Sequence, residues 1–236
     1  MSPNKDAATV HVHVEPVKYI NTVNAAALFA AELYRLPAAV HTWVLAAIGD
    51  LAPLSFWSVP ASMSGKYHPR ACRRLGGLVV HTRYAVRWLD RLTERAALKL
   101  DDTGRAAAVA ALLLHDLHKY RCPGALRNRA GYRLADATPT AAHGHWTADL
   151  LERFMADYYR GNPGLEAELA PVLRLAIPAV RYHMGEWGIG WPDVLDDRFD
   201  PTTFRLVWTV HLADYCAAMA ADDALADVGD LKGGRL

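Results

Sequence analysis

Cysteine is scarce in this chain of 236 residues, which has three, widely spaced and without a CxxC pair. That scarcity argues against a disulfide-stapled fold and against a cysteine zinc site. The sequence also opens without the apolar segment that a secretory signal peptide requires. We therefore expect a cytoplasmic protein with reduced thiols.

Long uninterrupted hydrophobic runs are missing as well. The most apolar stretch covers residues 25–48. Glu32, Arg35 and His41 interrupt it. A membrane-spanning helix needs about 20 predominantly apolar residues and does not normally carry such side chains. We therefore expect no contact with a membrane.

An excess of charge of one sign is also lacking, since the formal net charge is +1. A global field for binding polyanions is therefore not expected. The charge is uneven, however, because residues 51–89 carry six basic side chains and residues 117–135 carry five, with no acid in either stretch. These stretches are either two solvated basic faces or a local positive field for phosphate.

What the sequence does have is a helical pattern rich in alanine and leucine, which predicts an all-α fold. Expected helices span residues 22–34, 37–50, 77–98, 103–119, 144–159, 165–183 and 201–226. The alternating HVHV at residues 11–14 is compatible with a short strand. We expect three parts: an N-terminal helical extension over residues 1–50 packed on the core, a main domain over 51–226, and a flexible tail over 227–236.

The strongest chemical signal is the pair His115-Asp116, which ends the apolar run of residues 106–114. Burying a polar pair there is costly unless something compensates, and a divalent cation is one such partner. Lys119 follows on the same helical face and can hold a phosphate oxygen. The alternative interpretation of the pair is an ordinary capped helix end.

Other polar residues strengthen the signal, because His81, His143, His183 and Asp214 each stand at an apolar position or a helix end of a different predicted helix. Any one of them alone is more often a core or capping residue than a ligand. Together they bring chemistry-bearing side chains to five predicted helices.

The order of these residues resembles the HD-domain superfamily of metal-dependent phosphohydrolases, whose pattern is an isolated His, a His-Asp pair and a late Asp. The segment HGHWTADLL at residues 143–151 resembles the family's HGxxGAxxL helix start, which nominates His143 over His145. The segment HDLHK at 115–119 resembles HDxGK, with His118 in place of the glycine. The segment YHMGEWG at 182–188 resembles HHGxxxG and nominates His183.

Motifs ahead of the His-Asp pair narrow the resemblance. PAS at residues 60–62, GKYHP at 65–69, GGL at 76–78 and HT at 81–82 are similar to those of the HD domains in 3′-to-5′ exoribonucleases and in conjugative relaxase-type proteins. The resemblance covers residues 56–218. It implies an HD-domain helical bundle with a few extra N-terminal helices.

The resemblance also implies a two-metal site. One metal is assigned to His81, His115, Asp116 and Asp214, and the other to Asp116, His143 and His183. Histidine nitrogens with carboxylates suit transition metals, here Mn, Fe, Ni, Co or Zn. In this expectation a hydroxide bridging two cations attacks phosphorus, and Asp116 and Lys119 are the catalytic residues.

The expected substrate is a nucleotide or a single-stranded nucleic acid. Lys66, His68, Arg70 and Arg181 are the predicted substrate-binding residues. Trp187 is a candidate for base stacking, as is Tyr67, with rim packing as the alternative for both. His211, three residues before Asp214, is a candidate for supporting the site.

Several functional alternatives remain open at this stage. A 3′-to-5′ exonuclease competes with a small-nucleotide phosphodiesterase or phosphatase. A catalytically silent HD domain that binds nucleotides or serves as a conjugation scaffold, and a purely structural helical bundle, are the non-enzymatic alternatives. The sequence carries no signal of the oligomeric state.

Overall fold

The computed structural model describes residues 14–62, 67–95, 98–120, 126–127, 133–134, 140–189 and 199–220. Within these residues the fold is all-α, as predicted, with one short antiparallel hairpin. The helices are α1 (Val14–Leu28), α2 (Ala30–Leu33), α3 (Ala38–Leu51), α4 (Gly77–Arg95), α5 (Asp102–Leu114), α6 (His143–Gly161), α7 (Glu166–Tyr182) and α9 (Pro201–Met219). The remaining elements are the 3₁₀ turns η1 (Leu54–Trp57), η2 (Arg70–Arg73), η3 (Thr140–Ala142) and η4 (Gly185–Trp187) and the strands β1 (Leu126–Arg127) and β2 (Arg133–Leu134).

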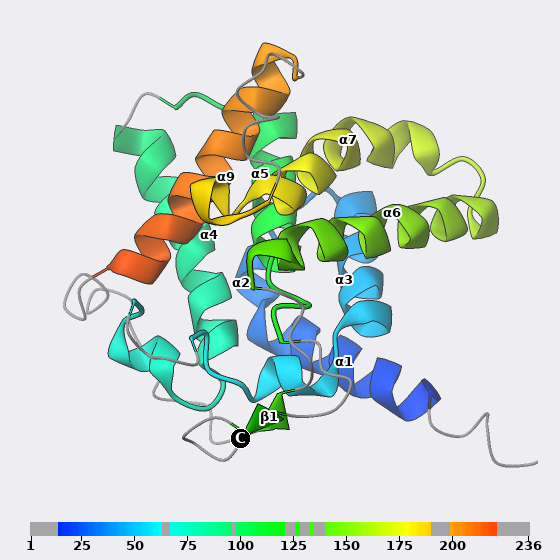
Figure 1. The fold of residues 1–236 in the computed structure, drawn as a ribbon. Helices are drawn as coiled ribbons and strands as arrows, with labels where there is room; N and C mark the ends of the chain where they lie inside the picture. The colour runs from blue at the N-terminus through cyan, green and yellow to red at the C-terminus, as the bar shows by residue number, and fades with distance from the viewer. Residues whose placement is uncertain are drawn as a thin grey trace, which may run out of the picture.

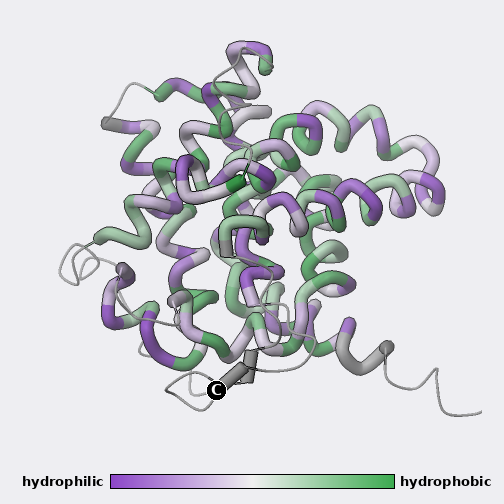
Figure 2. The backbone as a smooth tube through the Cα atoms, viewed as in Figure 1, coloured by the Kyte–Doolittle hydropathy of each residue, from purple (hydrophilic) through white to green (hydrophobic). Residues whose placement is uncertain are grey.

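Helix α5 runs through the middle of the bundle and packs against α3, α4, α7 and α9 (Figure 1). Every residue from Ala106 to Leu114 is buried. A helix that is apolar on all sides is stable only when it is surrounded. Five of these nine residues are alanines, whose small side chains let neighbouring helices approach closely. Figure 2 shows the complementary pattern, with hydrophilic residues on the outer turns of α6 and α7.

The N-terminal helices lie directly on the rest of the bundle. The buried amide of Asn21 on α1 donates to the carbonyl oxygens of Gly49 and Ala52, and it accepts a 2.7 Å hydrogen bond from the indole nitrogen of Trp57. Helix α3 packs on α5, α6 and α7. The division at residue 50 stays a prediction, and the tail at 227–236 lies outside the described residues.

Several predicted boundaries were wrong. The first helix begins at Val14 rather than residue 22 and breaks at Phe29, whose ψ of 18° departs from helical geometry. Since Val14 is helical, a strand over residues 11–14 is wrong at that residue, while residues 11–13 lie outside the described part. Helix α9 ends at Met219, not 226. The hairpin was not foreseen.

The most consequential correction concerns α5, which ends at Leu114 rather than residue 119. Beyond it the backbone hydrogen bonds span three residues instead of four. Leu117 N donates to Leu114 O at 3.2 Å, and Lys119 N donates to Asp116 O at 3.1 Å. Consecutive residues of a regular α-helix point about 100° apart. His115 and Asp116 nevertheless reach one shared space between helices, where Nε2 of His115 lies 3.4 Å from Oδ2 of Asp116.

Candidate metal centre

Six side chains from five segments meet in that space. His81 lies on α4, His115 and Asp116 follow α5, His143 opens α6, His183 follows α7, and Asp214 lies on α9. All four histidines are buried, as is Asp116. Asp214 keeps 16% of its side chain exposed and so gives the group its contact with solvent. These are the six residues that the sequence nominated as metal ligands.

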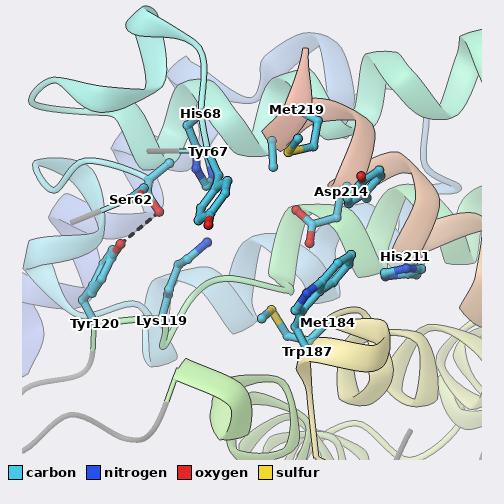
Figure 3. A pocket seen from close by; sticks show the side chains of 13 residues that line it. Ser62, Tyr67, His68, Lys119, Tyr120, Met184, Trp187, His211, Asp214 and Met219 are labelled. Carbon is cyan, nitrogen blue, oxygen red and sulfur yellow. Dashed lines mark hydrogen bonds between the residues drawn. The ribbon is translucent and has the colours of Figure 1, made fainter. Parts of the chain in front are cut away.

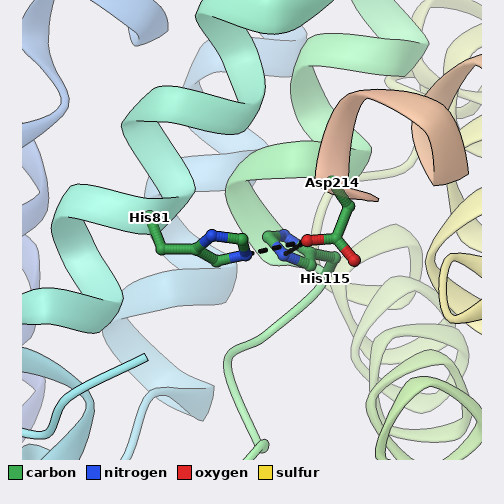
Figure 4. Close-up of side chains that lie close together, drawn as sticks. All are labelled: His81, His115 and Asp214. Atoms are coloured by element: carbon green, nitrogen blue, oxygen red, sulfur yellow. Dashed lines mark hydrogen bonds and ion pairs between the residues drawn. The ribbon is translucent and has the colours of Figure 1, made fainter. Parts of the chain in front are cut away.

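One cluster joins α4, α5 and α9. The Oδ1 atom of Asp214 lies 2.8 Å from Nε2 of His81 and 3.5 Å from Nε2 of His115. Figure 4 shows His81 and His115 turned toward this carboxylate. The three ligand atoms lie within 4.8 Å of one another, so this trio can hold a metal ion.

A second cluster joins the end of α5 to α6 and α7. The Nε2 atom of His143 lies 2.8 Å from Oδ1 of Asp116 and 2.9 Å from Nε2 of His183. His183 Nε2 is 3.6 Å from the same Asp116 oxygen. His115, Asp116 and His183 form a second trio whose ligand atoms lie within 4.8 Å.

Asp116 stands between the two clusters. Its Oδ1 atom faces His143 and His183, while its Oδ2 atom lies 3.4 Å from Nε2 of His115 and 3.7 Å from Nε2 of His81. A carboxylate with one oxygen toward each group can contact an ion in either. The two clusters are therefore one continuous polar centre.

The distances between the ligand atoms suit coordination of a transition metal. Bonds of about 2.0–2.2 Å place neighbouring ligand atoms about 3 Å apart, and the spacings here run from 2.8 to 3.7 Å. His115 and His183 each donate from Nδ1 to a backbone carbonyl 2.7 Å away. In a neutral ring this leaves the lone pair on Nε2, directed into the centre. Among the described residues, the buried Nε2 of His115 has no hydrogen-bond partner.

The protonation states suit cation binding. Burial lowers the pKa of His81, and it lowers that of His183 to about 4 even though Asp116 opposes it. Burial works to raise the pKa of Asp116, yet Lys119 and His115 hold it well below its ordinary value. The centre therefore offers neutral imidazoles and an ionised carboxylate, which are the forms that bind metal.

His115 behaves differently. Burial lowers its pKa, but the carboxylates of Asp116 and Asp214 outweigh burial and raise it above the ordinary value. Asp214 itself is held well below its usual pKa, against its burial, by His115 and His81. Without a cation, a proton on His115 supplies the positive charge that the two carboxylates attract.

Two glycines allow the segments that carry the histidines to pack closely. A Cβ atom on Gly144 would lie 2.8 Å from the carbonyl oxygen of Arg181 and 2.9 Å from that of Val180, so α6 and α7 meet backbone to backbone beside His143. Gly185 has φ of +59°, and a Cβ there would clash with the ring of His211. That ring donates from Nδ1 to the carbonyl oxygen of His183 at 2.8 Å. His211 thus braces the turn that carries His183.

A cavity of about 690 Å³ opens beside the centre (Figure 3). Its lining residues are Ala61, Ser62, Tyr67, His68, Lys119, Tyr120, Met184, Trp187, His211, Asp214, Tyr215, Ala218 and Met219. Figure 3 shows Lys119 and Asp214 pointing into it from opposite sides. The Nζ atom of Lys119 lies 2.7 Å from Oδ2 of Asp116, and this partner raises the lysine pKa although burial opposes the shift. The cavity thus reaches the polar centre.

The predicted substrate-binding residues fall in different places. His68 lines the cavity and packs edge-on against His81, with ring centroids 4.9 Å apart. Burial lowers its pKa to about 3, and its ring nitrogens have no hydrogen-bond partner among the described residues. Arg70 is exposed on η2 outside the lining. Arg181 also lies outside it, and Lys66 is not among the described residues.

Arg181 instead joins α7 to α6. Its Nη1 atom lies 2.7 Å from Asp149 and its Nη2 atom 2.9 Å from Glu152. Sequence reasoning also passed over Tyr215, Met184 and Met219, which line the cavity. The position of Tyr215 directly after the nominated Asp214 was the one available signal.

Comparisons with protein-family models, with curated proteins and with solved structures each gave no match to this chain. The buried His and Asp clusters of the centre can hold a metal ion, and they are the feature of this chain that bears on its function. Among the described residues, no helix has the length and apolar character to cross a bilayer.

Proposed function

We propose that this chain is a metal-dependent phosphohydrolase of the HD type, acting on phosphoesters of nucleotides or of single-stranded nucleic acid. The observation that carries the proposal is the position of Asp116, with one oxygen toward each of two His-containing clusters. A carboxylate shared in this way is the arrangement expected for two cations about 3.5–4 Å apart. The sequence motifs at His81, His115 and Asp214 support the same proposal.

Each part of the centre then has a chemical role. Divalent cations bound there would supply Lewis-acid activation of the phosphoester and of an attacking water. Lys119, held 2.7 Å from Asp116 at the cavity floor, places a positive charge where charge develops on the phosphoryl oxygens. His68 lines the same cavity and can hydrogen-bond an ester or phosphoryl oxygen.

The metal is drawn from Mn, Fe, Ni, Co and Zn, because imidazole and carboxylate ligands favour these over calcium. We propose two cations per chain. In this proposal the two aspartates, Asp116 and Asp214, and the four buried histidines hold the cations, and Lys119 acts on the substrate.

The test combines elemental analysis with hydrolysis of bis(p-nitrophenyl) phosphate, with and without added manganese. We expect two metal equivalents per chain and turnover, both lost in Asp116→Ala. Asp149→Ala is the matched control, because Asp149 is a half-exposed aspartate that pairs with Arg181 outside the cavity lining.

The outcomes separate the alternatives. Metal without turnover on any phosphoester would favour the silent, nucleotide-binding HD domain over the enzyme. A folded protein that takes up no cation when offered several would overturn the proposal entirely.

A further inference from the structure

Two large aromatic rings stand exposed at the edge of the cavity. Trp187 of η4 and Tyr215 of α9 stack in parallel, with centroids 5.3 Å apart and an angle of 5° between the rings. Their exposed fractions are 52% and 39%. Met219, also 52% exposed, and Met184 line the same cavity. None of the residues in this wall of two aromatic rings and two thioethers belongs to the candidate metal clusters.

The wall and the polar centre are neighbours. Tyr215 follows Asp214 directly, so one turn of α9 carries a carboxylate of the centre and then an aromatic ring. Figure 3 shows Trp187 near Asp214 and His211, with Lys119 across the cavity. A ligand in this cavity therefore contacts both ionic groups and flat, polarisable surfaces.

Packing and backbone hydrogen bonds position the turn that carries Trp187. The ring of Trp187 lies 5.9 Å from that of His211, and His211 is buried and hydrogen-bonded to the carbonyl oxygen of His183. The backbone N–H of Trp187 donates to the carbonyl of Met184. The positive φ of Gly185 makes this turn possible. Trp187 therefore extends from a defined turn beside the cavity, and a ring positioned before binding lowers the entropy cost of binding a ligand.

We propose that Trp187 and Tyr215, with the two methionines, form a subsite for a planar aromatic group of the substrate. The inference rests on the proposed function and narrows it to small aromatic phosphoesters of nucleotide size. Aromatic rings and thioethers attract flat π-systems, while Lys119 and the metal centre attract the phosphate. A volume of about 690 Å³ lies in the range of small-molecule sites.

The test compares AMP with ribose phosphate, which lacks the base, as ligands of the metal-loaded protein in titration calorimetry. We expect AMP to bind at least about fivefold more tightly, since stacking a base on an aromatic side chain commonly contributes that much or more. Trp187→Leu should bring the two affinities to within about twofold while leaving the metal content unchanged. Tyr215→Leu should reduce the ratio in the same direction.

The matched control is Trp146→Leu on α6, because Trp146 is 40% exposed but does not line the cavity. It should keep the wild-type ratio. In steady-state assays with a nucleoside p-nitrophenyl phosphate, Trp187→Leu should raise KM several-fold with kcat little changed, and Trp146→Leu should change neither.

The results distinguish this inference from the proposed function. Equal affinities for AMP and ribose phosphate in the wild type, or a ratio that survives Trp187→Leu, would overturn the aromatic subsite even if metal and turnover are present. A ratio abolished by Trp187→Leu in a protein without turnover would retain the subsite and reject the enzyme. Tight, salt-sensitive binding of single strands with no preference for AMP would likewise overturn the restriction to small substrates.

Discussion

The Nε2 atoms of His143 and His183 lie 2.9 Å apart and share the Oδ1 atom of Asp116. His183 already donates from Nδ1 to a carbonyl oxygen, so its neutral ring can only accept at Nε2. Without a cation, therefore, His143 must carry the proton between them. A bound metal would displace this proton and coordinate the Nε2 lone pairs of both rings.

Proton displacement gives the first prediction, which concerns pH. The pKa of His115 is raised, chiefly by Asp116 against the effect of burial, so the metal-free protein binds a proton there that a cation must expel. Zinc affinity should therefore rise as pH increases toward and through this pKa and fall on acidification. Calorimetry in buffers of different ionisation enthalpy should detect proton release, and pH-independent uptake without proton release would contradict the prediction.

The second prediction is that metal stabilises the fold. A ligand that binds only the native state raises stability by about 2.7 kcal/mol at a free concentration of one hundred times Kd. Differential scanning calorimetry should show Tm rising with added zinc or manganese and falling with a chelator. Asp116→Asn should abolish the shift, and Asp149→Asn should preserve it.

The third prediction uses the close approach of α6 and α7. Gly144→Ala places a Cβ against two backbone carbonyls, so we expect a loss of about 1–3 kcal/mol in the free energy of unfolding and weaker metal binding at His143. Gly161→Ala is the control on the same helix, since nothing lies within 4 Å of its Cβ position. Denaturant unfolding measures both, and equal effects would contradict the packing argument.

The fourth prediction concerns Asp200, which caps α9 by accepting hydrogen bonds from the backbone of Thr202 and Thr203. Asp200→Ala should cost about 1 kcal/mol at neutral pH. Hydrogen bonds, first from the Thr203 hydroxyl, lower the pKa of Asp200 in the folded protein. The ionised carboxylate therefore stabilises the fold fully at pH values above the pKa of aspartate in the unfolded chain, about 3.9. This charge-dependent stabilisation should be lost as the pH falls through the lowered pKa of Asp200 in the folded protein.

Asp200→Asn separates the cap from its charge. Asparagine caps helices about as well as aspartate, so this variant should retain most of the stability at neutral pH and lose the acid-dependent part. Thermal unfolding of the three proteins between acid and neutral pH gives the comparison.

Much of the fold could be predicted because the sequence is periodic and its apolar run over residues 106–114 fits only a surrounded helix. The end of α5 could not, since residues 115–119 contain no glycine or proline to mark it, yet the backbone hydrogen bonds change to the i→i+3 pattern after Leu114. Where a helix changes to tighter turns depends on what its side chains meet across the bundle. Here they meet the other members of the centre.

The candidate site was likewise predictable only in part from the sequence. His81, His115 and Asp214 could be nominated from motif order, but the partners of Arg181 could not, because Glu152 lies 29 positions away and is brought near only by the packing of α6 on α7. The cavity wall at Trp187 and Tyr215 likewise depends on how η4 meets α9. Local sequence contains no record of such contacts.

The separation of His81 and Asp214 by 133 residues has a consequence for the order of assembly. Contacts between distant segments are generally the slowest to form, and domains begin folding from the N-terminus during synthesis. A growing chain can bring α4 through α7 together, with four histidines and Asp116, before α9 exists. The last described helix adds Asp214 and Tyr215 together, so the ion cluster and the aromatic wall are completed in the same step.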